Sequence, residues 1–261
     1  MESLIRLSIA LTVFIVMVSL EYFIHRRKPV LTRQQRWPVN LGLALTNMVL
    51  MRFTIGSLAF LTAVHVQQMN WGVLNQVALP YELHGLLSVL LLDLAIYIQH
   101  VISHKWQPLW RLHQVHHTDL EFDATTAVRF HPLEIWISML YKAAWIVILG
   151  ADPQAVIVFE VILNGAATFN HSNIHIPTKL DKILRGLLIT PDVHRIHHST
   201  LPTETDSNYG FSISLWDRLF GTYIAEPQSP QTEMAIGLAP YRKPEQLKWF
   251  SLLLLPFKKP S

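Results

Sequence analysis

Long apolar runs constrain this chain more than any other feature. About 20 consecutive apolar residues suffice for a helix to cross a bilayer. Hydrophobic residues make up 51% of the sequence and charged residues only 15%. We therefore predict an all-α integral membrane bundle of about four spans, the last two forming a hairpin, with a cytoplasmic histidine-rich helical cap. The apolar runs are Ser3–Phe23, Leu41–Val66, Leu83–Ile102, Leu133–Leu149 and Pro153–Phe169.

One basic segment sets the expected orientation of the spans. His25–Pro38 carries five Lys or Arg residues and no acid. Short loops of this kind stay in the cytoplasm. The third run would then exit into the cytoplasm at His104. Gly150–Pro153 is expected to be a tight turn, so the hairpin returns to the same side at His171.

Domain boundaries follow from these runs. We divide the chain into N-terminal anchor spans (1–82), a metal-binding domain that includes spans (83–224) and a C-terminal tail (225–261). Leu41–Val66 is interrupted by Arg52, so two shorter pieces remain an alternative to one span there. In the tail, Leu247–Phe257 is too short to span and is expected to lie at the membrane interface.

Composition excludes several classes of site. The chain has no cysteine, so disulfides, thiolate-ligated haem, cysteine-ligated iron–sulfur clusters and cysteine zinc sites are ruled out. The net charge is only +3, and no basic-aromatic pattern for nucleic-acid binding is present. Basic residues beside apolar runs fit anionic lipid headgroups instead.

Histidines cluster at helical spacings. Eleven of the fourteen lie between His100 and His198. Residues three and four apart share one face of a helix, so each cluster points several imidazoles at one place. Many neighbouring histidines would repel one another if protonated, whereas metal ions bind them neutral. Nine or more convergent histidines exceed the roughly six ligands of one ion and imply two ions. Imidazole suits zinc, copper, iron and nickel, so the ligands alone do not choose the metal. The clusters are His100 and His104; His113, His116 and His117; His171 and His175; and His194, His197 and His198.

The order of these clusters, with the words around them, resembles a known family. DLAIYIQHVISH, LWRLHQVHHTD, TTAVRFHPLE, FNHSNI, TPDVHRIHHS and WDRLFGTY are similar to segments of the fatty acid hydroxylase and sterol desaturase superfamily, which comprises membrane di-iron oxygenases. The similarity runs from about Asp93 to Thr222 and is greatest to short bacterial members. Carried over by position, it implies that the catalytic iron ligands are His100, His104, His113, His116, His117, His171, His194, His197 and His198.

Four further residues beside these clusters are candidates for the site. His131 is an additional metal ligand or a group that contacts a ligand; the alternative is that it caps the helix before Pro132. His175 is either a ligand or a histidine outside the coordination sphere. Ligating histidines commonly donate their other N–H to a carboxylate. We assign this role to Asp93 and Asp192, and expect Asp119 and Asp123 to be solvated surface acids.

The resemblance also implies a function. It predicts a multi-pass oxygenase with two non-haem iron ions that hydroxylates or desaturates a fatty acyl, sterol or ether lipid with O2. Electrons would come from a separate ferredoxin- or cytochrome b5-type donor and its reductase. The expected location is a bacterial inner membrane, or the endoplasmic reticulum of a eukaryote, with a cytoplasmic active site.

Two other functions stay open at this point. One is a membrane zinc-dependent lipid hydrolase, which would need neither oxygen nor a reductant. The other is a non-enzymatic haem- or metal-binding membrane protein, although a transporter would hold its ligands near the membrane midplane.

Overall fold

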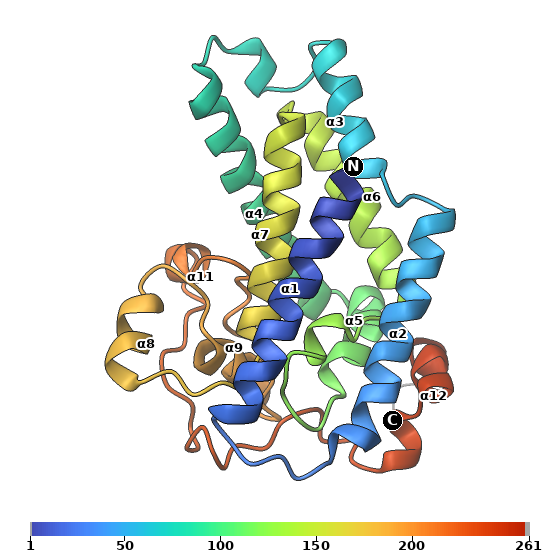
Figure 1. Cartoon of the computed structure of the whole chain (residues 1–261), viewed down its shortest axis with the longest axis vertical. Coiled ribbons are helices and arrows are strands. Elements are labelled where there is room, and N and C mark those ends of the chain that lie inside the picture. Colours follow the sequence, from blue (N-terminus) through green and yellow to red (C-terminus); the bar gives the residue numbers. More distant parts are fainter. Residues whose placement is uncertain (1, 259–261) are drawn as a thin grey trace.

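The computed structural model describes residues 2–258, with side chains from residue 7 onward. Within this range the chain is helical and forms isolated β-bridges but no strand, which confirms the all-α prediction (Figure 1). The longer helices are α1 (Glu2–Phe23), α2 (Arg33–Phe53), α3 (Leu58–Gln68), α4 (Tyr81–Lys105), α5 (Gln107–His117), α6 (Pro132–Leu149) and α7 (Pro153–Asn170). The shorter ones are η1 (Leu74–Gln76), η2 (Thr126–Val128), α8 (Thr178–Leu184), α9 (Pro191–His197), α10 (Pro202–Thr205), α11 (Leu215–Leu219), η3 (Pro244–Leu247), α12 (Trp249–Leu254) and η4 (Leu255–Phe257).

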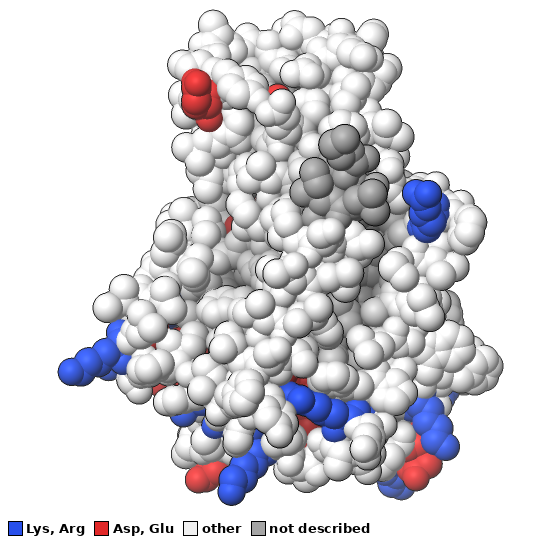
Figure 2. All heavy atoms as spheres, viewed as in Figure 1, with Lys and Arg blue, Asp and Glu red and all other residues white. Residues whose placement is uncertain are grey.

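The helices form a narrow stem and a wider cap. In Figure 1, α3 and most of α4, α6 and α7 make the upper stem, whereas α5, α8, α9, α11 and α12 surround its lower end. Charged side chains gather on the cap, and the stem is almost free of them on the face drawn in Figure 2. An uncharged stem and a charged cap are expected of a bundle that stands in a bilayer.

Three helical segments of the described chain are long and apolar enough to cross a membrane. They are Arg33–Gln68, Tyr81–Lys105 and Pro132–Leu149. A shorter apolar helix, Leu7–Phe23, lies before them. The predicted third run and the first arm of the hairpin are thus confirmed as membrane-length helices.

The second apolar run is broken in two. α2 ends at Phe53, α3 begins at Leu58, and Arg52 is exposed. This corresponds to the alternative of two shorter pieces. α2 also begins at Arg33, well before the apolar run, so the last six residues of the basic segment are helical rather than a loop. A side-chain oxygen of Gln35 accepts the Thr32 N–H at 2.9 Å and stabilises this start.

The α6–α7 hairpin turn has the predicted chemistry. Gly150 ends α6 with φ +74°, in the left-handed region that favours glycine. Asp152 caps α7 by accepting the N–H groups of Gln154 and Ala155, both at 2.9 Å. The sequence around the turn therefore fixes the hairpin locally.

Replacing Gly150 should destabilise this turn. A Cβ atom there would lie 2.6 Å from the Trp71 carbonyl oxygen. An alanine would also have to adopt φ +74°, which residues with a side chain rarely do. Gly150→Ala is expected to cost about 1–3 kcal/mol of unfolding free energy. Gly165→Ala in α7 is the matched control, because its Cβ meets nothing within 4 Å and should add about 0.5–1 kcal/mol. Unfolding in detergent measures both, and equal effects would contradict the strain argument.

Small and branched side chains pack the stem. Ala59 and Ala63, one turn apart on α3, lie in a buried cluster with Ile146 of α6 and with Val156 and Phe159 of α7. Small residues at a helix interface let backbones approach closely. This packing holds the hairpin against α3 and α4, whose lower end carries the first histidines.

A buried charge network ties α2 to the loop after α5. Arg36 donates to both carboxylate oxygens of Asp119 at 2.7 Å and to Asp123 at 2.7 Å. The Asn40 side chain donates to Asp119 at 3.0 Å. The expectation that these two aspartates are solvated is therefore wrong. Both aspartates are buried because the buried guanidinium of Arg36 requires carboxylate partners.

The tail packs on the cap as well. Leu252 of α12 and Leu255 of η4 are buried against Leu43 of α2 and Val115 of α5. Phe250 and Phe257 remain exposed. The tail thus contacts protein on one side, and the proposed division at 82 and 224 stays a prediction.

Candidate metal centre

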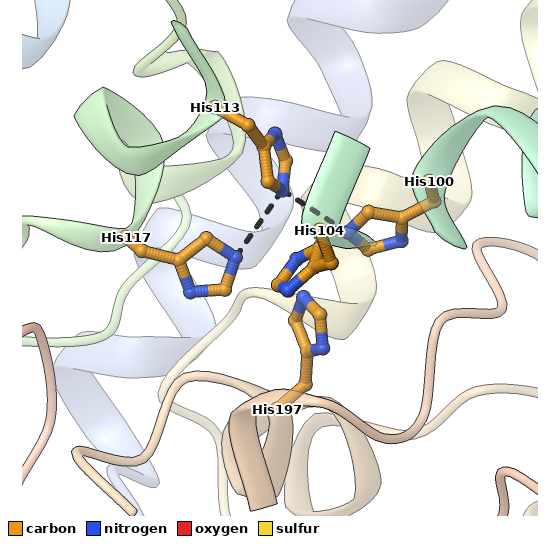
Figure 3. Close-up of side chains that lie close together, drawn as sticks. All are labelled: His100, His104, His113, His117 and His197. Atoms are coloured by element: carbon orange, nitrogen blue, oxygen red, sulfur yellow. Dashed lines mark hydrogen bonds between the residues drawn. The ribbon is translucent and has the colours of Figure 1, made fainter. Parts of the chain in front are cut away.

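Five histidines from three helices converge on one point beside the lower end of α4. The nearest ring nitrogens of all five lie within 4.8 Å of one another, and Figure 3 shows the rings facing a common centre. Helix α4 supplies two of them, α5 supplies two, and α9 supplies one. This five-histidine group is His100, His104, His113, His117 and His197.

Four further histidines form a second group directly beside the first. Their ligand atoms also lie within 4.8 Å of one another. His117 of the first group stacks on His198 of the second, with 4.5 Å between ring centroids. The two groups are therefore adjacent and share a wall of imidazoles. This four-histidine group is His116, His171, His194 and His198, all buried.

The two H-x-x-H-H motifs serve the groups reciprocally. On α5, His113 and His117 are four apart and enter the five-histidine group, whereas His116 turns to the other. On α9, His194 and its partner four residues on enter the four-histidine group, and His197 turns back. The last two histidines of each motif are consecutive and point about 100° apart around the helix, so they enter different groups. Each motif therefore supplies both groups.

Spacing of the ring nitrogens fits metal coordination. His113 Nε2 lies 3.2 Å from Nε2 of both His100 and His117. His171 Nε2 lies 3.1 Å from Nε2 of both His116 and His194. Ligand atoms about 2.1 Å from one ion are themselves about 3.0–3.4 Å apart. Neutral imidazoles in such contact fit a shared cation better than mutual hydrogen bonds.

Several buried nitrogens have no hydrogen-bond partner among the described residues. Both ring nitrogens of His104 and His198, and Nε2 of His197, fall in this class. A buried polar nitrogen left without a partner is costly. The donor set therefore fits two metal ions that prefer nitrogen ligands.

Burial keeps these imidazoles neutral. Desolvation lowers the pKa of His171 to about 4 and of His197 to about 3. The pKa values of His116, His194 and His198 are also lowered, first by burial and then by neighbouring histidines. Neutral imidazole is the metal-binding form, so the cap presents ligands in the required state.

Fixed acceptors orient the rings from behind. His100 Nδ1 donates to the Tyr209 carbonyl, His171 Nδ1 to the Ala167 carbonyl and His197 Nδ1 to the Ser207 carbonyl, each at 2.7 Å. Such bonds fix the tautomer with Nε2 toward the metal. All three acceptors are backbone carbonyls, which no residue type in the sequence marks.

Glu134, which was not among the predicted site residues, is the carboxylate that contacts a ring nitrogen of a candidate metal ligand. His113 Nδ1 lies 2.6 Å from a Glu134 oxygen, and Glu134 is buried in the first turn of α6. Asp206 lies 3.4 Å from His104 Nδ1 and is the second nearby acid. An acid at the start of an apolar span, two residues after Pro132, was the available signal for Glu134.

Removing this carboxylate should loosen metal binding. Glu134→Gln keeps the size of the side chain but weakens the bond that orients His113. We expect metal affinity to fall about 10- to 100-fold, as measured by competition with a chelator. Glu82→Gln, in the first turn of α4 at the far end of the stem, is the control and should retain the metal. Equal retention by both variants would contradict the role of Glu134.

Two predicted metal residues lie outside both groups. His131 caps α6, accepting the Leu133 N–H on Nδ1 at 3.2 Å, and its Nε2 lies 3.2 Å from the Leu253 carbonyl oxygen. His175 is exposed after the end of α7. The structure thus matches the helix-cap reading of His131 and the reading that leaves His175 outside the coordination sphere.

The two aspartates assigned to histidine N–H groups have other partners. Asp93 accepts the indole N–H of Trp216 at 2.8 Å. Asp192 pairs with Arg26 at 3.0 Å and with Arg195 at 2.5 Å. A guanidinium outcompetes a neutral imidazole for a carboxylate because its bond is charge-assisted. Both aspartates therefore brace the elements that carry ligands.

Comparison with known proteins agrees with this geometry. The sequence profile of the fatty acid hydroxylase family matches residues 85–222. The chain belongs to the fatty acid hydroxylase family. The matched residues contain all nine histidines of the two groups.

Individual relatives within this family are distant. The chain is 27% identical over 158 residues to ornithine lipid hydroxylase OlsE of Rhizobium tropici, covering 60% of this chain and 46% of that protein. It is 29% identical over 163 residues to alkylglycerol monooxygenase of Xenopus tropicalis, covering 60% and 35%. For cholesterol 25-hydroxylase of Rattus norvegicus the identity is 25% over 148 residues, covering 56% and 48%. The chain thus spans less than half the length of these relatives, and no solved structure matches it.

Proposed function

We propose that this fatty acid hydroxylase family member is a membrane-bound di-iron oxygenase that inserts oxygen into, or desaturates, a lipid. The observation that carries the proposal is the convergence of nine histidines into two adjacent groups. Two ions follow from two groups, and an all-nitrogen pair of irons fits oxygen chemistry better than hydrolysis, which needs about three protein ligands on one zinc ion. The names of the three relatives support a lipid substrate.

A cavity connects this centre to the stem. Its volume is about 300 Å³, and His100, His113 and Glu134 lie at one end of its wall. Ile96 of α4 and Leu163 of α7 line it farther up the stem. A lipid chain held along this wall would bring one of its carbons next to the five-histidine group.

Bound iron would supply the activation of dioxygen with electrons from a separate donor. The chain's residues would do the rest: each histidine group would hold one ion, and Glu134 fixes the orientation of the His113 ring through its Nδ1. The apolar part of the wall, which includes Ile96 and Leu163, would keep the substrate chain near the centre and limit access of water. Backbone acceptors prevent the rings from rotating away.

The cap is proposed to face the cytoplasm. Arg26, in the basic segment, pairs with Asp192 in the first turn of α9, and Arg27 donates to the Met234 carbonyl at 2.9 Å. The basic segment and the metal centre therefore lie on one side of the bundle. By the positive-inside rule that side is cytoplasmic, in an inner membrane or the endoplasmic reticulum, where a ferredoxin- or cytochrome b5-type donor could reach it.

Isotopically labelled dioxygen tests the function. Cells that express the wild type, or a His116→Ala/His117→Ala variant, are grown under the label and their lipids are analysed by mass spectrometry. We expect labelled lipid, or a lipid with a new double bond, in the wild type alone. A different set of results would favour a zinc hydrolase instead: neither lipid product is formed, the purified protein contains zinc, and it cleaves esters without a reductant.

A further inference from the structure

Two short helices of the cap turn apolar faces outward. In α8 and the turn after it, Leu180, Ile183 and Leu187 recur at steps of three and four, and all three are exposed. In α11, Leu215 and Leu219 are four apart and are both exposed. Residues at these spacings share one face of a helix. Large apolar side chains that gather on an exposed face mark an interaction surface.

The two faces form one surface, which we call the apolar shoulder. The Ser214 N–H donates to the Leu187 carbonyl at 2.8 Å, and Leu188 pairs with Ile213 in an antiparallel bridge. These bonds place the start of α11 beside the turn after α8, on one side of the stem (Figure 1). The members of the shoulder are between 48% and 74% exposed: Leu180, Ile183, Leu187, Leu215, Leu219 and Phe220.

The shoulder lies beside a membrane-length helix. The Trp216 indole N–H in α11 donates to Asp93 of α4 at 2.8 Å, and Phe220 stacks on Tyr97 of α4 with 5.4 Å between ring centroids. The apolar run of α4 begins at Leu83, and a hydrocarbon layer of about 30 Å covers about 20 residues of helix. Asp93 and Tyr97 follow Leu83 by 10 and 14 residues. α11 therefore contacts α4 at the level of the hydrocarbon layer.

The opposite faces of the two helices are fixed by the protein interior. Trp216 and Asp217 of α11 are buried, and Asp217 accepts the backbone N–H groups of Tyr209 and Gly210, both at 2.8 Å. Asp181 of α8 is buried as well. These contacts set the rotation of each helix, so the outward direction of the apolar faces is a consequence of the packed fold.

Basic side chains border the shoulder. Lys179 and Lys182 of α8 are exposed beside Ile183. A lysine can lay its apolar stem along such a surface and keep its charged group at the lipid headgroups. An amphipathic helix with lysines beside its apolar face is typical of the membrane interface.

We propose that the apolar shoulder is immersed in the membrane leaflet on the cap side, with Lys179 and Lys182 at the lipid headgroups. The occupant is lipid rather than a partner protein, because the shoulder adjoins the apolar stem at the level of Asp93 and Tyr97. His100 follows Tyr97 by three residues on the same helix, so the metal centre lies against the bilayer surface. This placement requires only that the stem spans a bilayer, and it does not depend on the oxygenase chemistry.

A fluorescent label tests the placement. Because the chain has no cysteine, Ile183→Cys or Leu219→Cys provides a unique position for a bimane label. The labelled full chain in nanodiscs is exposed to two quenchers, bromine on the lipid acyl chains and iodide in the water. We expect loss of fluorescence with the brominated lipid, and little loss with iodide, at both positions.

Two further positions calibrate the quenchers. Leu86→Cys, on the exposed surface of α4 in the stem, should lose fluorescence with the brominated lipid. Glu233→Cys, beside the Met234 carbonyl that accepts from Arg27, is exposed on the cap and should respond to iodide. Circular dichroism checks that each labelled variant is folded.

Two results would overturn the proposal. Stronger quenching by iodide than by the brominated lipid at Ile183→Cys and Leu219→Cys would place the shoulder in water. Protection from both quenchers would show that protein covers it, either a second copy of this chain or a different partner. No turnover occurs in this assay, so a failure of the proposed oxygenase function would leave the quenching unchanged and would be seen only in the labelled-dioxygen experiment.

Discussion

A His116→Ala/His198→Ala variant is expected to retain about one metal ion and to lose about 100-fold or more of the lipid oxygenation. These substitutions remove two of the four ligands in one group and leave the five-histidine group complete. Under the proposed function two adjacent ions would act together on dioxygen, so the loss of one should remove the activity rather than halve it. Metal analysis by mass spectrometry and the labelled-dioxygen assay measure both effects.

His175→Ala is the matched control for this variant. It removes a histidine of the same sequence region that is exposed and lies outside both groups. Full metal content and full activity are expected. Loss of metal from His175→Ala, or two ions in the double variant, would contradict the division into groups of five and four.

Asp119→Asn is expected to lower the free energy of unfolding by about 3–5 kcal/mol. Both oxygens of Asp119 accept from Arg36, and Asn40 and Thr126 donate to it as well. Arg129, also buried, lies close enough for the carboxylate to stabilise its charge. The amide would leave two guanidinium groups without enough negative charge in the protein interior. Denaturation in detergent, followed by circular dichroism, measures the loss.

Glu226→Gln is the control for the charge network. It also removes a carboxylate that pairs with an arginine, Arg185, at 3.3 Å, but Glu226 is 72% exposed. Exposed pairs contribute about 1 kcal/mol or less. If Asp119→Asn proves as mild as Glu226→Gln, the buried network does not hold α2 on the cap.

Local patterns were sufficient for much of the architecture. Apolar length predicted the helices of the stem, and Gly150 with Pro153 predicted the hairpin turn, because helix ends and turns depend on neighbours in sequence. Asp93, Tyr97, His100 and His104 recur at steps of four, three and four, which places them on one face of α4. These residues face protein, and the Tyr97 hydroxyl lies 2.9 Å from the Thr222 hydroxyl. Periodicity reports which side chains share a face.

Which partner each side chain meets was decided by the tertiary structure. The spacing on α5 and α9 showed that three histidines converge, but only packing of the two helices divided them between groups of five and four. Likewise Glu134, rather than Asp93 or Asp192, lies behind a metal-site histidine, and Lys142 meets Glu160 across the hairpin. The spacing of residues along a helix fixes direction, whereas contacts between distant segments depend on how whole helices pack, which no local pattern encodes.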